Sequence, residues 1–163
     1  MKIALLQLNF VVGDISANAD KIIKAATTVP PDTDLIVTSE LALVGYPPKD
    51  LVLYDYFIQE TWDTLESLAH SLKKHPPILV GAVTRNKKSI GKPLHNSAVL
   101  LEKGQITQVF HKTLLPTYDV FDEDRYFEPA TTAQILELGS ERIGISICED
   151  SWNDRDFWQK QRY

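Results

Sequence analysis

The chain has 163 residues, of which 44% are apolar and 24% are charged, a composition typical of one globular domain. Its 17 Lys and Arg against 22 Asp and Glu give a net charge of −5, which offers no general attraction to nucleic-acid phosphates or anionic membranes. No apolar run approaches the about 20 residues that cross a bilayer, and the first residues lack a signal-peptide pattern. We therefore expect a cytoplasmic protein with no nucleic-acid and no membrane partner.

The first half of the chain alternates strand-like and helix-like segments. Residues 3–10 are apolar and strand-like, and Ser16 is a candidate N-cap for a helix that ends by Pro30 and Pro31. Residues 34–39 carry the short apolar run of a buried strand and place Glu40 at its carboxyl end.

The segment 54–74 repeats apolar residues at every third or fourth position, the stripe of an amphipathic helix. The second half is rich in strands, and Lys103 and Gly104 form a predicted hairpin turn. The predicted strands are 78–84, 96–101, 106–111, 135–138 and 142–148. This order predicts an α/β layered fold with a mixed sheet and helices on one face.

The sequence contains a single cysteine, Cys148, so no disulfide can form within the chain. Alternation in segment 142–148 places three isoleucines on one strand face, and Gly144, Ser146 and Cys148 on the other. Small neighbours leave room for a ligand to approach the sulfur. On this pattern alone, a buried structural cysteine is as common as a reactive one.

Two other reactive side chains occupy equivalent places. Glu40 and Lys112 each follow an apolar strand, as Cys148 does. Because the carboxyl ends of strands form the ligand crevice of open α/β sheets, we expect the three to share one site. A thiol nucleophile, a carboxylate that accepts its proton and a lysine that favours thiolate and stabilises an oxyanion are a set suited to acyl transfer.

Three sequence blocks carry a family resemblance. The segments 38–48, 111–116 and 147–152 resemble the nitrilase, or carbon–nitrogen hydrolase, superfamily, in which a glutamate, a lysine and a cysteine follow one another in this order. More narrowly, residues 118–129 and 148–150 look like the glutaminase domains of glutamine-dependent NAD synthetases.

The resemblance implies a nitrilase-type α-β-β-α sandwich, with Glu40 as general base and acid, Lys112 as the oxyanion-stabilising cation and Cys148 as nucleophile. It further implies that Tyr46, Tyr118 and Glu149 contact bound glutamine. A supporting carboxylate is also expected after the lysine, and both Glu123 and Glu128 remain open for that role. No metal site is expected.

The resemblance also concerns the length of the chain. Family domains continue well past the cysteine, whereas this sequence stops at Tyr163, so we expect residues 1–163 to be an incomplete glutaminase domain without the synthetase domain. The glutaminase step needs no cofactor, and ATP and Mg²⁺ would serve the full-length synthetase that amidates nicotinic acid adenine dinucleotide. We expect self-association through the face that the missing part would cover.

Three alternatives remain. The first is a stand-alone nitrilase-type amidase or carbamoyl hydrolase with the same triad. The second is a papain-like pair in which His111 is the base of Cys148, although His111 would point to the strand face opposite to that of Lys112. The third is a non-catalytic domain in which Cys148 is a core residue, Glu40 a solvated strand end and Lys112 a surface charge.

Overall fold

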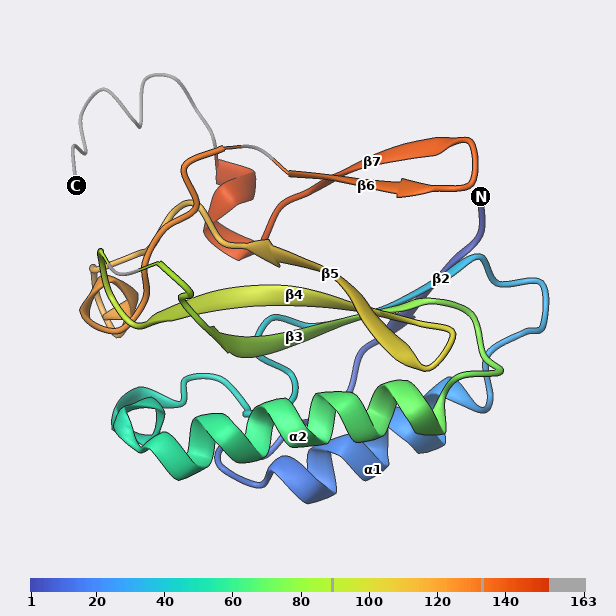
Figure 1. Ribbon diagram of the computed structural model, residues 1–163, viewed down its shortest axis with the longest axis horizontal. Helices are drawn as coiled ribbons and strands as arrows, with labels where there is room; N and C mark the ends of the chain where they lie inside the picture. Colours follow the sequence, from blue (N-terminus) through green and yellow to red (C-terminus); the bar gives the residue numbers. More distant parts are fainter. Residues whose placement is uncertain (89, 133, 153–163) are drawn as a thin grey trace.

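The computed structural model describes residues 1–88, 90–132 and 134–152 (Figure 1). Its helices and strands are, in chain order, β1 (Ile3–Leu6), α1 (Ile15–Ala26), β2 (Leu35–Thr38), α2 (Asp55–Ser71), β3 (Ile78–Arg85), β4 (Leu94–Glu102), β5 (Gln105–His111), β6 (Gln134–Leu138) and β7 (Glu141–Ile145). Three short 3₁₀ helices are η1 (Lys49–Leu53), η2 (Glu123–Arg125) and η3 (Cys148–Trp152). In the described part of the chain, no helix is long and apolar enough to span a membrane.

Five strands form one mixed sheet in the order β1-β2-β3-β4-β5, and β6 and β7 form a separate antiparallel hairpin. The first three strands are parallel, whereas β4 is antiparallel to both β3 and β5. Strand β5 therefore runs in the same direction as β2, and their carboxyl ends meet at one edge of the sheet. Helices α1 and α2 cover one face, and the β6–β7 hairpin lies over the other (Figure 1). This arrangement confirms the expected α/β layers with helices on one face.

The helices follow their apolar periodicity, but one predicted cap is wrong. Asp14, not Ser16, is the N-cap of α1, and its carboxylate accepts a hydrogen bond from the amide of Ala17 at 3.1 Å. Aspartate and serine are both good caps, so the choice depends on where Ile15 begins to pack into the core. Helix α2 buries its predicted stripe of Ile58, Leu65, Ala69 and Leu72, whereas Trp62 of the same stripe is half-buried.

Two predicted strands are shorter in the structure. Strand β1 ends at Leu6 rather than at residue 10, because β2 offers only four partners, from Leu35 to Thr38. Strand β7 ends at Ile145, so Cys148 lies in η3 rather than in a strand. The left-handed φ of Cys148, 48°, is incompatible with a continuing strand.

The hairpin turn at Lys103 and Gly104 is confirmed, since both residues have positive φ (51° and 87°) between the paired Glu102 and Gln105.

Each face of the five-stranded sheet has its own apolar core. The helix-covered face carries the larger one, in which Ile22, Leu65 and Val80 are fully buried. The smaller one lies under the hairpin, where Leu136 of β6 packs on the sheet; its other buried members are Leu35, Leu79, Leu100 and Phe110. Burial of these apolar side chains therefore favours packing of the hairpin on this sheet.

Gly81 of β3 is a close-approach position beneath the end of β2. A Cβ added there would lie 2.2 Å from the carbonyl oxygen of Ser39 and 2.6 Å from the amide nitrogen of Leu41. Both atoms belong to backbone, so they cannot rotate away. The absence of a side chain at Gly81 therefore allows the turn that carries Glu40 to lie against β3.

We expect Gly81→Ala to lower the free energy of unfolding by about 2 kcal/mol or more, because the methyl group forces the Ser39–Leu41 backbone off β3. Denaturant titration of the variant measures this loss. Gly144→Ala is the matched control, since a Cβ there meets nothing within 4 Å and should change stability by less than about 1 kcal/mol. Equal stability of the two variants would contradict the close packing at Gly81.

Candidate active site

A buried ammonium group is the centre of the cluster at the sheet edge. Lys112 directly follows β5, its side chain is 0% exposed, and its amide donates to the carbonyl of Asn96 at 2.8 Å. Its Nζ donates to Glu40 Oε1 at 2.6 Å and to Glu123 Oε2 at 2.9 Å. Burial alone would lower the pKa of Lys112, but the two carboxylates outweigh burial and raise it. Lys112 is therefore a buried cation, not a surface charge.

Glu40 reaches Lys112 from the end of β2. The next residue, Leu41, has a left-handed φ of 48° and is fully buried, so the chain turns sharply just beyond the carboxylate. Such backbone strain persists only where the surroundings over-determine it, and it clusters at functional sites.

Asn96 is a member of the cluster that the sequence analysis missed. Its side-chain amide donates to Glu40 Oε1 at 2.7 Å and to Glu123 Oε2 at 3.2 Å, so one NH₂ group bridges both carboxylates. Asn96 is 1% exposed and lies inside β4. The available signal was a run of polar residues, His95 to Ser97, in a strand that is otherwise mostly apolar, because buried polar groups need partners.

Of the two open candidates for the supporting carboxylate, Glu123 contacts Lys112. It lies in η2, within the aromatic-rich segment 113–132, and is 5% exposed. Burial and the neighbouring Glu40 raise the pKa of Glu123, with Lys112 opposing them. Glu128 instead accepts the amide of Lys92 at 2.9 Å.

Tyr46 borders the same carboxylate. Its hydroxyl donates to Glu123 Oε1 at 3.0 Å, and burial together with the charge of Glu123 raises the pKa of the phenol. A hollow of about 270 Å³ adjoins this point, with Tyr46, Phe121 and Glu123 in its wall.

Cys148 enters the cluster from the second sheet. The residue is exposed and begins η3 with its left-handed φ. Burial of its thiol, then the charge of Glu40, raise the pKa of Cys148 to about 11, and Glu40 is also its hydrogen-bonding partner. Lys112 lowers the pKa of Cys148, as expected of a nearby cation, but burial and the charges of Glu40 and Glu123 outweigh it.

Glu149 and Tyr118 form the outer part of the cluster. Glu149 is 4% exposed, and its Oε2 accepts a hydrogen bond from the Tyr118 hydroxyl at 2.9 Å. The ring of Tyr118 lies edge-on to Phe121 at 5.4 Å, and Phe121 lies 6.3 Å from Tyr46, between ring centroids. All six predicted site residues are thereby connected.

His111 belongs to a different network on the helix-covered face. Its Nδ1 and the Ser97 hydroxyl are 2.8 Å apart, and its ring stacks on His95 at 3.9 Å. Burial and the charges of His95 and Lys88 lower the pKa of His111 to about 4. This placement opposes the papain-like alternative, in which His111 would serve Cys148.

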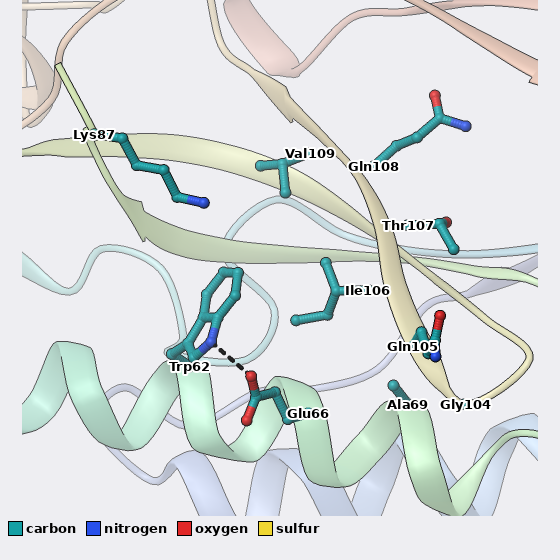
Figure 2. A pocket seen from close by; sticks show the side chains of 10 residues that line it. All are labelled: Trp62, Glu66, Ala69, Lys87, Gly104, Gln105, Ile106, Thr107, Gln108 and Val109. Atoms are coloured by element: carbon teal, nitrogen blue, oxygen red, sulfur yellow. Dashed lines mark hydrogen bonds between the residues drawn. The ribbon is translucent and has the colours of Figure 1, made fainter.

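A larger hollow, of about 530 Å³, lies elsewhere, between α2 and the edge strand β5. Figure 2 shows Trp62 and Ile106 in its wall, with the Trp62 indole donating to Glu66 at 2.9 Å. None of the predicted site residues lines it. Within the described ranges, no group of three or more His, Cys, Asp or Glu is arranged to hold a metal ion.

Comparison with known proteins gives a consistent result. Residues 2–158 match the carbon–nitrogen hydrolase family. The chain is 49% identical over 165 residues to the glutamine-dependent NAD(+) synthetase of Synechocystis sp.. This match covers 99% of this chain and 30% of that protein.

Solved structures agree. The glutamine-dependent NAD+ synthetase of Acinetobacter baumannii, in complex with ADP, matches with a TM-score of 0.80 and 32% identity over 97% of this chain and 29% of that one. A carbon–nitrogen hydrolase from Helicobacter pylori G27 matches with a TM-score of 0.70 and 25% identity over 93% of this chain and 52% of that one. The chain thus spans 30% or less of the length of the NAD synthetases named here.

The raised pKa of Cys148 gives a testable pH dependence. Alkylation by iodoacetamide requires thiolate, so its rate should rise with pH toward a midpoint at about 11. Glu40→Gln should shift this midpoint to lower pH, because it removes the negative charge that opposes ionisation. Mass spectrometry at a series of pH values measures the rate, with the exposed Glu60→Gln on α2 as control. A midpoint unchanged by Glu40→Gln would contradict the assignment.

Proposed function

The chain belongs to the carbon–nitrogen hydrolase family, and on that premise we propose that it hydrolyses the side-chain amide of glutamine to glutamate and ammonia. The observation that carries the proposal is the buried Lys112 between the carboxylates of Glu40 and Glu123, with the thiol of Cys148 against Glu40. This set supplies a nucleophile, a proton acceptor and a fixed cation.

In the first step, Cys148 Sγ attacks the amide carbon of glutamine while Glu40 takes the thiol proton. The resulting oxyanion is stabilised by the Lys112 ammonium and by the backbone N–H of Glu149. Glu40 then returns the proton to the departing nitrogen, so ammonia leaves and a thioester remains on Cys148.

In the second step, a water molecule attacks the thioester. Glu40 accepts a proton from that water, a second tetrahedral oxyanion forms at the same donors, and the C–S bond breaks to release glutamate. The proton on Glu40 returns to the sulfur and restores the thiol. The roles of Glu123 and Asn96 are to hold Glu40 and Lys112 in place through these cycles.

Glutamine recognition is assigned to Tyr46, Tyr118 and Glu149. The buried Glu149 carboxylate, oriented by Tyr118, provides charge-assisted acceptors for the α-ammonium of an amino acid. A simple aliphatic amide lacks that group. This feature favours glutaminase activity over a stand-alone amidase or carbamoyl hydrolase acting on other small substrates.

The relatives suggest how the ammonia is used. We propose that residues 1–163 form the glutaminase part of a glutamine-dependent NAD synthetase, whose synthetase domain amidates nicotinic acid adenine dinucleotide with ATP and Mg²⁺. We assign ATP and Mg²⁺ to that domain and to no step of glutamine hydrolysis.

Glutaminase chemistry predicts covalent trapping at Cys148. A glutamine-like electrophile, such as a diazoketone analogue of glutamine, should add to Cys148 of the wild-type chain, and excess glutamine should protect it. Intact mass and peptide mapping measure the adduct. Cys148→Ala should lose both the adduct and all glutamine hydrolysis, a drop of at least about 1,000-fold.

Glu149→Ala separates recognition from chemistry. Iodoacetamide should still modify its Cys148, whereas glutamine should no longer protect the thiol, because the anchor for the α-ammonium is gone. Full protection by glutamine in this variant, or an adduct on another residue, would refute the proposed substrate or nucleophile.

We also propose that the chain self-associates through the sheet face beside the hairpin. Leu5 is 75% exposed and Ile3 43% exposed on that face, next to their β2 partners Val37 and Leu35. Burial of such side chains against a second copy is favourable. Light scattering should report a dimer or larger species, and Leu5→Glu should dissociate it. A clean monomer in a sample of about 1 mM, 100 times more concentrated than a dilute one, would count against this interface.

A further inference from the structure

The Asp150 carboxylate connects the two segments that carry Lys112 and Cys148. Its Oδ1 accepts hydrogen bonds from the amides of Thr113 at 3.0 Å and Leu114 at 2.8 Å, which directly follow Lys112. Its Oδ2 accepts the amide of Ile147 at 3.0 Å, which directly precedes Cys148. One side chain thus binds three backbone amides on two separate elements.

This connection has a specific geometric task. Lys112 lies at the end of the five-stranded sheet, whereas Cys148 follows β7 of the separate hairpin. No β-ladder connects the two sheets among the described residues. The distance and orientation between the cation and the thiol must therefore be set by side-chain contacts across the gap.

Asp150 also acts within the turn. Its own amide donates to the Ile147 carbonyl at 3.1 Å, while its Oδ2 holds the Ile147 amide. Both polar groups of Ile147 are thereby held just before the residue with the left-handed φ. Since hydrogen bonds to a carboxylate are stronger than neutral ones, this clamp can hold Cys148 in a conformation that costs about 1–2 kcal/mol for a non-glycine residue.

We propose that Asp150 is a positioning residue that holds the Cys148 thiol against Glu40 and at a fixed place relative to Lys112. It does not touch the substrate. The proposal rests on the glutaminase function where turnover is concerned, but its effect on the thiol does not depend on the identity of the substrate.

Asp150→Asn is the test. Asparagine keeps one acceptor oxygen and replaces the other by an NH₂ donor, so either the Ile147 link or the Thr113 and Leu114 links must break. The thiol then moves from Glu40, and its alkylation midpoint should fall from about 11 toward that of an ordinary thiol, by one pH unit or more. Glutamine turnover should decrease about 10- to 100-fold in kcat, with KM changed less than about 3-fold.

Asp14→Asn is the matched control. Asp14 also accepts a backbone amide, that of Ala17, but it caps α1 on the helix-covered side of the fold. This variant should change thermal stability little, because asparagine caps helices about as well as aspartate, and should keep both the alkylation midpoint and the kcat of the wild type. A purely structural role of Asp150 would give the same result in Asp150→Asn, and that outcome would overturn the proposal.

Two further measurements keep the result decisive. Circular dichroism checks that each variant is folded. If Asp150→Asn does not fold, Asp150→Glu replaces it, since glutamate retains the charge but displaces the oxygens by one methylene. It too should lower the alkylation midpoint, and an unchanged midpoint overturns the proposal. If the wild-type chain shows no glutamine turnover, the glutaminase function fails while the alkylation arm still tests Asp150.

Discussion

The buried charge of Lys112 is the constraint on which the rest of the site depends. Removing an ammonium from water costs several kcal/mol, so a fully buried lysine stays charged only with close carboxylates. Glu40 and Glu123 meet that need from two distant segments, the end of β2 and the loop after β5. Two carboxylates around one cation repel each other, and the Asn96 amide that bridges them reduces this cost. Removal of Lys112 would leave two largely buried carboxylates without their cation.

A second constraint is that the nucleophile comes from another sheet. Apolar contacts bring the hairpin onto the five-stranded sheet, but such contacts are not directional and do not define a register. Polar links supply the register. The Gln134 side-chain amide donates to the carbonyl of His111 at 2.9 Å and accepts its amide at 3.1 Å, as a strand neighbour would. The Tyr118 hydroxyl adds a link to Glu149 beyond the thiol. The hairpin is therefore aligned by few contacts, each of which affects where Cys148 lies.

Much of this could be predicted from the sequence, and the failures have physical reasons. Apolar periodicity located α2 and β3, and the strand-end positions of Glu40 and Lys112 predicted that these two meet, as β2 and β5 do run in the same direction. Cys148 joins them from η3 after the separate hairpin, a placement that depends on tertiary packing. The choice of Glu123 over Glu128 was not accessible, since it depends on how a long loop folds back onto the sheet. Asn96 was missed for a related reason: its partners lie 56 and 27 residues away. The turn at Cys148 was read as strand because alternation continues through Ile147, while pairing stops at Ile145.

Burial, together with the charge of the cluster, explains why the thiol rests protonated. With Glu40 and Glu123 ionised and Lys112 charged, the cluster is net negative by one charge before the thiol ionises, so a thiolate would add a second negative charge. A low-pKa thiolate would be open to oxidation at an exposed position, whereas a protonated thiol is a poor target for oxidants. The nucleophile then forms only as Glu40 removes the proton during attack, when negative charge passes on to the substrate oxygen beside Lys112. A high thiol pKa and an adjacent base are therefore two parts of one arrangement, in which activation waits for the electrophile.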